Sequence, residues 1–392
     1  MHRLIVKEGN DAMRIKVVVA FGGESVEHEI SILSAHQVMQ AMNPMKYEVI
    51  PLYIAKDGRL LYHPLNTELE RFENLDKVER EGYEVSLQRR GNRFYMCPNK
   101  YSFLRKEISF DMVFPILHGT HGEDGTFQGY LSTLHIPYIG CSVLGGAIGQ
   151  DKIIMKQILE DSGLPVAPWF YWTLLKPLDD TFFRKAERLS YPLIVKPANL
   201  GSSIGVAKVE NEVELHRAMI EAYQYDGRVV IEKAIEHVQE INCAVLGDEQ
   251  TCEASVLEEV LSSKDILSYA DKYVCGEGVK GIVSTRRCIP ARIDEELALE
   301  IQTLAKECFR CLCASGTGRI DFLYNRETKD LYINEINTIP GSLAFYLWEK
   351  SNLPFPKLID RLVQIAKKRY AQEQKHVYSY SVNILRLQGK GK

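Results

Sequence analysis

A mostly apolar, β-branched run near the N-terminus constrains the fold more than any other feature of the sequence. Residues 15–21 read IKVVVAF, and a β-branched run of this kind is typical of a strand that is covered on both faces. A Gly-Gly pair follows, apolar residues then recur at helical spacing within 32–42, and YEVIPLYI at 47–54 reads as a second strand. A strand, a helix and a strand in this order predict an open parallel α/β domain, whose ligand loops lie at the carboxyl ends of its strands.

The length of the chain predicts more than one domain. At about 150 residues per domain, 392 residues correspond to two or three domains. In the second half of the chain the pattern changes to short strands in antiparallel style, with YPLIVKPA, GVAKVE, VVIEKAI and EINCAVLG in succession. We therefore expect an N-terminal α/β domain at 1–150, a central α+β domain at 151–240 and a C-terminal α+β domain at 241–392. Residues 57–110 are polar and mixed; we expect short strands there without a clear periodic signal, and the segment reads as an insertion.

Composition excludes several classes of protein. The chain has 48 Lys and Arg residues against 52 Asp and Glu residues, a formal net charge of −4, so it presents no global basic field for nucleic acid or anionic membranes. No apolar run reaches the roughly 18 to 20 residues that cross a bilayer, and residues 1–14 lack the apolar centre of a signal peptide. We therefore expect a cytoplasmic protein with no nucleic-acid and no membrane partner, whose nine cysteines are free thiols.

Two predicted strands near the C-terminus carry the strongest chemical signal. In GRIDFLY, Arg319 and Asp321 are two residues apart and project from one face of the strand, and the same holds for Glu335 and Asn337 in LYINEIN. Three oxygen donors on neighbouring strands suit Mg²⁺. The other interpretation is a polar sheet face on which Arg319 pairs with a carboxylate.

A lysine and a glycine-rich loop give a second signal. Lys196 lies between apolar residues in LIVKPANLGSSIG, where a lysine needs an anion, and the backbone N–H groups of the following loop can cradle phosphate. The alternative is a hairpin turn from which the lysine reaches solvent. Further on, the segment from Glu232 to Ile235 ends a strand and enters an irregular stretch, where an exposed backbone edge can pair with adenine, and Glu240 can accept from ribose hydroxyls. Single charges of this kind are more often surface residues.

Polar loops follow two of the predicted N-terminal strands. Glu27 and His28 follow the first strand, and His118, Glu123 and Asp124 lie in HGTHGEDG after a later one. Loops at the same edge of a sheet can face one site. A lone histidine in such a loop is more often a hydrogen-bonded structural residue than a catalyst.

Taken together, these segments resemble the D-alanine:D-alanine ligase family of ATP-grasp enzymes. The resemblance covers nearly the whole chain, from GGESVEHEIS at residue 22 to NEINTIPG, which ends at Gly341. Between them lie, in order, HGTHGEDGTFQG, IPYIG, QDK, VKPANLGSSIGV, IEKAI, SYADKY and GRIDF. The resemblance implies an ATP-grasp fold, in which the second and third domains enclose ATP between antiparallel sheets and the amino-acid pocket faces the first domain.

The resemblance also implies roles for individual residues. Contacts to ATP would come from Lys152, Lys196, Gly201, Ser203, Glu232, Lys233, Ile235, Glu240 and Lys272. Two Mg²⁺ ions, with Mn²⁺ as an alternative, would be held by Asp321, Glu335 and Asn337. The first amino acid would be bound by Glu27 and His118, with Tyr273 of a closing loop linked to Ser202 and Glu27. Arg319 and the N–H of Gly341 would stabilise an oxyanion, and Ser342 and Leu343 would bind the second carboxylate.

The reaction that the resemblance implies is ATP-dependent formation of D-alanyl-D-alanine, through an acyl phosphate, for peptidoglycan precursor synthesis; it also implies two D-amino acids as substrates and a homodimer. One departure concerns the second substrate. Pro340-Gly341 runs directly into Ser342-Leu343, where the family has several more residues, so the acceptor pocket must be reshaped. A different acceptor, such as D-lactate, D-serine or another amino acid, therefore stays open, as does a nucleotide-binding regulator without turnover.

Overall fold

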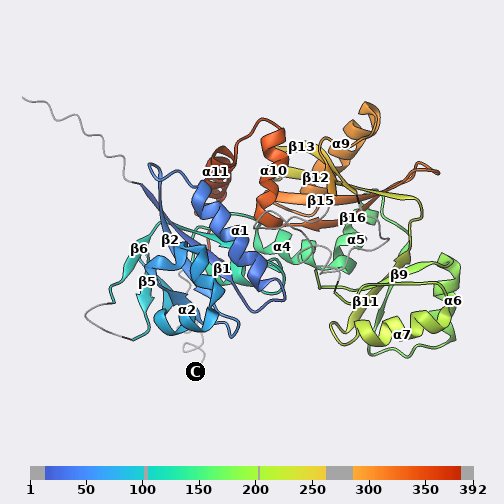
Figure 1. Ribbon diagram of the computed structural model, residues 1–392, viewed down its shortest axis with the longest axis horizontal. Coiled ribbons are helices and arrows are strands. Elements are labelled where there is room, and N and C mark those ends of the chain that lie inside the picture. The colour runs from blue at the N-terminus through green and yellow to red at the C-terminus, as the bar shows by residue number, and fades with distance from the viewer. Residues whose placement is uncertain (1–13, 101–104, 202–203, 262–285, 381–392) are drawn as a thin grey trace, which may run out of the picture.

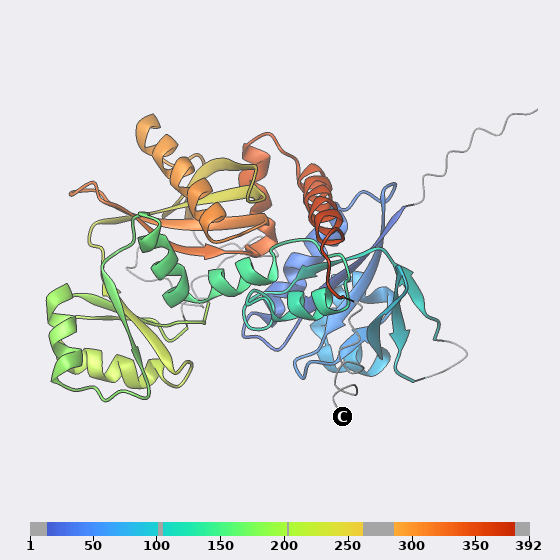
Figure 2. The same ribbon diagram turned by 180° about the vertical axis from the view of Figure 1, so that it is seen from behind.

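The structure is a computed structural model, and it describes residues 14–100, 105–201, 204–261 and 286–380. Three β-sheets organise these residues (Figure 1). The first and second sheets lie at opposite ends of the molecule and the third lies between them, as the view from behind also shows (Figure 2). The predicted roles of Ser202, Ser203, Lys272 and Tyr273 fall outside the described residues.

One seven-stranded sheet organises the N-terminal part of the chain. Its strands are β1 (Ile15–Gly22), β2 (Tyr47–Ile54), β3 (Leu60–Tyr62), β4 (Tyr83–Arg90), β5 (Arg93–Pro98), β6 (Ile108–Phe110) and β7 (Met112–Ile116). The helical segments are α1 (His28–Ala41), η1 (Pro64–Thr67), η2 (Leu69–Glu73), α2 (Leu75–Glu81), α3 (Thr126–Thr133) and α4 (Val143–Gln150). The strand order is β6-β5-β4-β3-β2-β1-β7, and β1 is parallel to β2 and to β7. The predicted strand-helix-strand opening is confirmed.

Residues 57–110 extend this sheet with antiparallel strands. β3 pairs with β2, and β4, β5 and β6 each pair with the strand before them. Burial alternates along β4, where Val85 and Leu87 are buried and their neighbours are not. β3 and β6 have only three residues each, and β4 has only Val85 and Leu87 buried among partly exposed and exposed residues, so the sequence pattern of these strands differs little from that of a loop.

A four-stranded sheet forms the central part. Its elements are α5 (Lys152–Asp161), β8 (Trp169–Thr173), α6 (Asp180–Leu189), β9 (Leu193–Pro197), β10 (Ala207–Val209), α7 (Glu212–Ala222) and β11 (Arg228–Lys233). The strand order is β10-β9-β11-β8, and every neighbouring pair is antiparallel. Helices α6 and α7 contribute Phe182 and Met219 to a core that contains Val195 and Ile231 of the sheet.

A five-stranded antiparallel sheet forms the third part. Its elements are β12 (Val238–Gly247), β13 (Cys252–Leu261), β14 (Arg286–Cys288), α9 (Glu295–Cys311), β15 (Gly316–Asn325), β16 (Leu331–Asn337), η3 (Gly341–Ala344), α10 (Phe345–Lys350) and α11 (Phe355–Glu373). The strand order is β14-β13-β12-β15-β16. The antiparallel strands predicted for the second half of the chain are therefore present, divided between two sheets.

The third sheet packs differently on its two faces. On one face Ile241 and Ile320 lie in a core that also contains residues of α5 and α9. On the other face Leu246 lies in a core with Trp348 of α10 and Val19 of β1. Because this second core includes residues of both the first and the third sheet, it holds the N-terminal part against the third sheet.

The described residues bear on two expectations, the absence of a membrane-spanning helix and the presence of free cysteine thiols. Within them, no helix combines the length and the apolar character needed to cross a bilayer. The cysteines that the structure describes are free thiols, as expected, and Cys275 lies outside the described ranges.

Candidate functional site

A row of polar residues crosses the third sheet on one face. From β13 through β12 and β15 to β16, the residues directly opposite one another are Glu258, Asn242, Asp321 and Glu335. Two residues further along β15 and β16, on the same face, Arg319 lies opposite Asn337. The structure thus brings together the polar side chains that the alternation of β15 and β16 places on one face.

Arg319 and Asp321 form a bidentate ion pair. Nε of Arg319 donates to Oδ1 of Asp321 and Nη2 donates to Oδ2, each at 2.7 Å. Nδ2 of Asn337 donates to the same Oδ2 at 3.1 Å. Burial disfavours the charged guanidinium, but Asp321 more than compensates and raises the pKa of Arg319 well above its usual range. The pairing of Arg319 with a carboxylate, one of the two interpretations of these strands, is therefore present.

The donor atoms on this face fit Mg²⁺ in chemical type. Asp321 and Glu335 offer carboxylate oxygens from adjacent strands, and Asn337 offers an amide oxygen. Because Asn337 contacts Asp321 through its nitrogen, its amide oxygen is directed elsewhere. An ion bound here would share Asp321 with Arg319.

Lysines are buried around the carboxylate of Glu232 on β11. Nζ of Lys196, on β9, lies 2.5 Å from Oε1, and Nζ of Lys156, on α5, lies 2.9 Å from Oε2. Burial alone would raise the pKa of Glu232, but the two ammonium groups lower it to about 2. Lys152 lies one turn before Lys156, is only 8% exposed, and its Nζ is 3.9 Å from Oε2 of Glu335. We call Lys152, Lys156 and Lys196 the lysine cluster.

The lysine cluster carries more positive charge than the carboxylates beside it. Three ammonium groups face Glu232 and Glu335. Burial lowers the pKa of Lys152 and of Lys156, so the charged forms of both side chains are destabilised here. A bound anion would offset this cost. The arrangement therefore favours an anionic ligand.

Lys156 has no role in the sequence-based prediction, although its spacing gives a signal. Lys152 and Lys156 are four residues apart on α5 and so lie on one face of that helix. Nζ of Lys152 donates to the carbonyl of Leu200 at 2.8 Å. Asp151 caps α5 by accepting from two backbone N–H groups of its first turn. The start of α5 thus sets Lys152 close to the loop at Gly201.

Glu27 lies where the N-terminal loops meet the loop at Gly201. Its side chain is buried. A methyl group on Gly119 would lie 2.8 Å from Oε2 of Glu27, and one on Gly201 would lie 3.2 Å from it. A predicted substrate-binding residue of the N-terminal part is therefore next to the predicted phosphate loop.

His118 is buried beyond the end of β7 and is bonded to α1. Its Nε2 lies 3.0 Å from Oγ of Ser34. Burial lowers the pKa of His118, and the opposing effects of Glu27 and the Ile339 backbone do not restore it. The ring is therefore neutral near pH 7.

Glu123 bridges the loop after β7 and the segment after β16. Its Oε2 accepts from the N–H of Gly119 at 2.9 Å, and its Oε1 accepts from the N–H of Ile339 at 3.1 Å. Burial, reinforced by the neighbouring Glu27, raises the pKa of Glu123 to about 8. The two backbone N–H groups favour the charged form of Glu123 but do not cancel this rise.

The segment after Pro340 forms a left-handed turn. Ser342, Leu343 and Ala344 have φ values of 50°, 58° and 51°. Residues with a Cβ pay about 1–2 kcal/mol each for this conformation. Three in succession therefore require anchoring contacts. The shortening of the chain at this point, noted in the sequence, coincides with the turn.

The remaining residues with predicted roles occupy several places. Glu240 lies on the same face of β12 as Asn242, two residues away. Lys233 donates from Nζ to two backbone carbonyls just before β9, at 2.9 and 3.1 Å. Ile235 is half-buried after the end of β11, and Gly341 begins η3.

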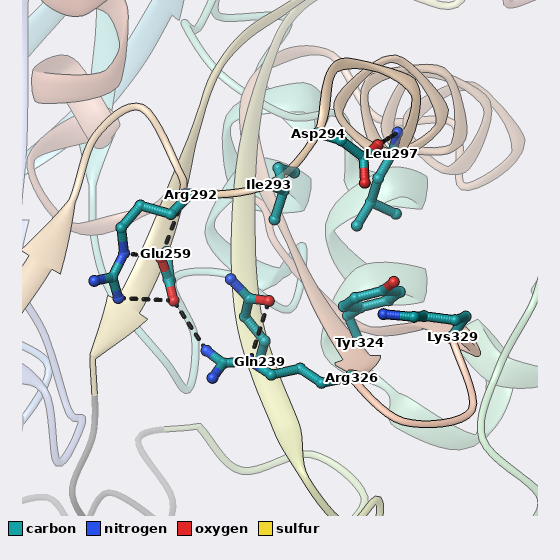
Figure 3. A pocket seen from close by; sticks show the side chains of 9 residues that line it. All are labelled: Gln239, Glu259, Arg292, Ile293, Asp294, Leu297, Tyr324, Arg326 and Lys329. Carbon is teal, nitrogen blue, oxygen red and sulfur yellow. Dashed lines mark hydrogen bonds and ion pairs between the residues drawn. The ribbon is translucent and has the colours of Figure 1, made fainter.

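A cavity of about 710 Å³ lies on the opposite face of the third sheet (Figure 3). Its lining residues are Gln239, Glu259, Arg292, Ile293, Asp294, Leu297, Tyr324, Arg326 and Lys329. The buried Glu259 accepts from Arg292 at 2.8 and 3.1 Å and from Arg326 at 3.1 Å. Glu259 follows Glu258 on β13, and successive residues of a strand face opposite sides. This cavity is therefore separate from the polar row, and none of the described residues with a predicted role lines it.

Comparisons with known proteins cover both halves of the chain. Residues 16–141 match the family model described as D-ala D-ala ligase N-terminus, and residues 158–364 match the one described as D-ala D-ala ligase C-terminus. A protein of Thermosipho melanesiensis named D-alanine--D-alanine ligase is 39% identical over 375 residues, 95% of this chain and 99% of that protein. One of the same name from Acetivibrio thermocellus is 38% identical over 91% of this chain and 96% of its own length.

Solved structures that resemble this one include members of the same ligase family. The D-alanine-D-alanine ligase from Coxiella burnetii is 29% identical with a TM-score of 0.80, over 96% of this chain and 99% of its own. The VanG D-Ala:D-Ser ligase from Enterococcus faecalis is 29% identical with a TM-score of 0.76, over 90% of this chain and 99% of its own. The expected ATP-grasp fold is thereby confirmed, and the chain belongs to the D-alanine:D-alanine ligase family.

Proposed function

We propose that this protein is an ATP-dependent ligase that joins two D-alanine molecules, forming D-alanyl-D-alanine for peptidoglycan precursor synthesis. The observation that carries the proposal is the position of the lysine cluster beside the polar row, where Lys152 lies 3.9 Å from Glu335. Buried ammonium groups beside carboxylates on strands suit a polyphosphate together with divalent cations. The names of the relatives support D-alanine as the substrate.

The ATP site in this proposal lies between the central and the third sheets. Lys152 and Lys196 contact phosphate oxygens, together with the loop from Gly201 to Ser203 and Lys272 of the closing loop. Glu232, Lys233, Ile235 and Glu240 contact adenine and ribose. The boundaries 1–150, 151–240 and 241–392 would then mark three domains around this site. Two Mg²⁺ ions, or Mn²⁺, held by Asp321, Glu335 and Asn337 would supply positive charge that offsets the charge of the transferring phosphoryl group.

The proposed chemistry has two steps. A carboxylate oxygen of the first D-alanine attacks the γ-phosphorus of ATP, and ADP leaves, which gives an acyl phosphate. The amine of the second D-alanine then attacks the acyl carbon, inorganic phosphate leaves, and the nitrogen loses a proton. Glu27 holds the ammonium group of the first substrate beside His118, and Tyr273 links Ser202 to Glu27 as the site closes.

Arg319 and the N–H of Gly341 are assigned to the oxyanion of the second step. The ion pair with Asp321 uses one N–H group each of Nε and Nη2 of Arg319, so the N–H groups of Nη1 and the second one of Nη2 are left to donate to the oxyanion. A donor held by an ion pair does not need to reorganise as charge develops. Ser342 and Leu343 are assigned to the acceptor side. We further propose a cytoplasmic homodimer that acts on these small molecules and not on nucleic acid or membranes.

A phosphate-release assay tests this function. The protein is incubated with ATP and Mg²⁺ and with a panel of D- and L-amino acids and hydroxy acids, and the products are identified by mass spectrometry. We expect release of phosphate with D-alanine and a product with the mass of the dipeptide. D-serine and D-lactate are included because the acceptor segment is shortened. Binding of ATP without phosphate release under every condition would instead indicate a regulator.

We expect Gly119→Ala to weaken binding of the first D-alanine. Gly119 has φ +70°, and a Cβ there would lie 2.7 Å from Oγ of Ser25 and 2.8 Å from Oε2 of Glu27, so Glu27 must move. Weakening one charge-assisted hydrogen bond, worth about 1.5–3 kcal/mol, should raise the KM of the first substrate about tenfold or more. Steady-state kinetics measures this effect. Gly91→Ala is the control, since Gly91 has φ +62° and nothing within 4 Å; equal KM values in the two variants would contradict the placement of Glu27.

A further inference from the structure

We infer that Ser34 and Gln37 of α1 are positioning residues for the acceptor segment, Gly341–Ala344. The inference rests on the proposed function, because it concerns the second substrate of that reaction. The N–H of Ser342 donates to Oγ of Ser34 at 3.2 Å, and the hydroxyl of Ser342 donates to Oε1 of Gln37. Ser34 and Gln37 are three residues apart on one helix, so both face the segment from the same side.

The conformation of the acceptor segment explains why it needs these bonds. Its three successive left-handed residues all carry a Cβ, so the backbone has more favourable conformations available to it. The N–H of Leu343 donates to the carbonyl of Pro340 within the turn, at 2.7 Å. Leu343 and Ala344 are packed in the core shared by the first and third sheets, and the two hydrogen bonds from Ser342 fix the turn against α1. Losing them would leave the buried N–H and hydroxyl of Ser342 without acceptors.

Ser34 and Gln37 differ in what else they contact. Oγ of Ser34 also lies 3.0 Å from Nε2 of His118, which is assigned to the first substrate. The side chain of Gln37 is hydrogen-bonded to Ser342 of the acceptor segment. Unlike Ser34, it has no described hydrogen bond to His118. Ser34 therefore joins the two substrate sides, whereas Gln37 supports one. This difference allows the two halves of the reaction to be separated by mutation.

The test uses Gln37→Leu and Ser34→Ala in the full-length protein. Donor activation is measured with ATP, D-alanine and hydroxylamine, whose nitrogen attacks the acyl phosphate, releases phosphate and leaves a hydroxamate. Dipeptide formation over a range of D-alanine concentrations gives the KM of the acceptor. For Gln37→Leu we expect an acceptor KM raised about tenfold with hydroxamate formation within about twofold of wild type. For Ser34→Ala we expect both measurements to worsen, by about tenfold each.

Ser31→Ala is the matched control. Ser31 is fully buried one turn before Ser34 on α1, and its hydroxyl donates to the carbonyl of Ile116 rather than to the acceptor segment. It should show neither the selective rise in acceptor KM nor a loss of hydroxamate. An unchanged acceptor KM in Gln37→Leu, or the same selective rise in Ser31→Ala, would overturn the inference. If wild type forms neither hydroxamate nor dipeptide, the proposed function itself fails, which is a different outcome.

Discussion

Asp321→Ala should lower turnover by about a thousandfold or more. In the proposed reaction Asp321 serves both a metal ion and Arg319, and the substitution removes both interactions. Arg319, whose side chain is only 23% exposed, would lose the bidentate partner that now fixes its orientation. Removal of one preorganised charge-stabilising group typically costs about 10²–10³ in turnover, and a metal ligand adds to this loss. Phosphate release at saturating ATP and D-alanine measures the effect.

Two comparisons separate loss of chemistry from loss of structure. Asp321→Asn keeps the size of the side chain but removes its charge, so it should lose most of the activity; circular dichroism at the assay temperature checks that the variant is still folded. Glu327→Gln changes an exposed carboxylate in the turn between β15 and β16 and should leave turnover unchanged. Electron paramagnetic resonance of Mn²⁺ in the presence of ADP gives a readout that does not depend on turnover. Near-normal turnover in Asp321→Ala would refute the metal assignment.

It was predictable from the sequence that the polar side chains of β15 share one face, and likewise those of β16, because side chains alternate between the two faces of a strand. Arg319 and Asp321 must share a face of any regular strand, and so must Glu335 and Asn337. The pairing register was not predictable, yet it sets Asp321 directly opposite Glu335. The same alternation gave no clear signal for residues 57–110, because β3 and β6 have only three residues each and the buried positions of the longer β4 are limited to Val85 and Leu87.

Contacts between distant segments account for most of what the sequence did not predict. Ser34 and Ser342 are 308 residues apart, and Glu123 and Ile339 are 216 apart. Neither pair has a local pattern that would indicate the contact. The lysine cluster was predictable only in part. The spacing of Lys152 and Lys156 indicates that both lie on one helix face, but it does not indicate that the carboxylate of Glu232 lies beside them. Buried polar partners are set by tertiary packing, and local pattern alone does not specify them.

Glu232→Gln should destabilise the folded protein by about 3 kcal/mol or more. Glu232 is 3% exposed, and its carboxylate is the counter-charge of Lys156 and Lys196. The substitution therefore leaves two buried ammonium groups without this negative charge. Breaking a buried ion pair by removing one partner typically costs about 3–5 kcal/mol. The pKa of Glu232, about 2 against an ordinary 4.5, corresponds to a similar figure of about 3 kcal/mol. Denaturant unfolding of wild type and variant at pH 7 measures the difference.

The pH dependence of this difference identifies its cause. Because the pKa of Glu232 is lower in the folded state than in the unfolded state, its stabilisation is present in full above about pH 5 and is lost as the pH falls from about 4 towards 2. The gap between wild type and Glu232→Gln should therefore close over that range. On the alkaline side the variant should recover part of its stability below the pH at which lysine ordinarily titrates, because burial already lowers the pKa of Lys156 and the neutral amine is cheaper to bury. Glu236→Gln, an exposed neighbour, should match wild type throughout. A gap that stays constant from pH 3 to pH 9 would mean that Glu232 acts through packing and not through charge.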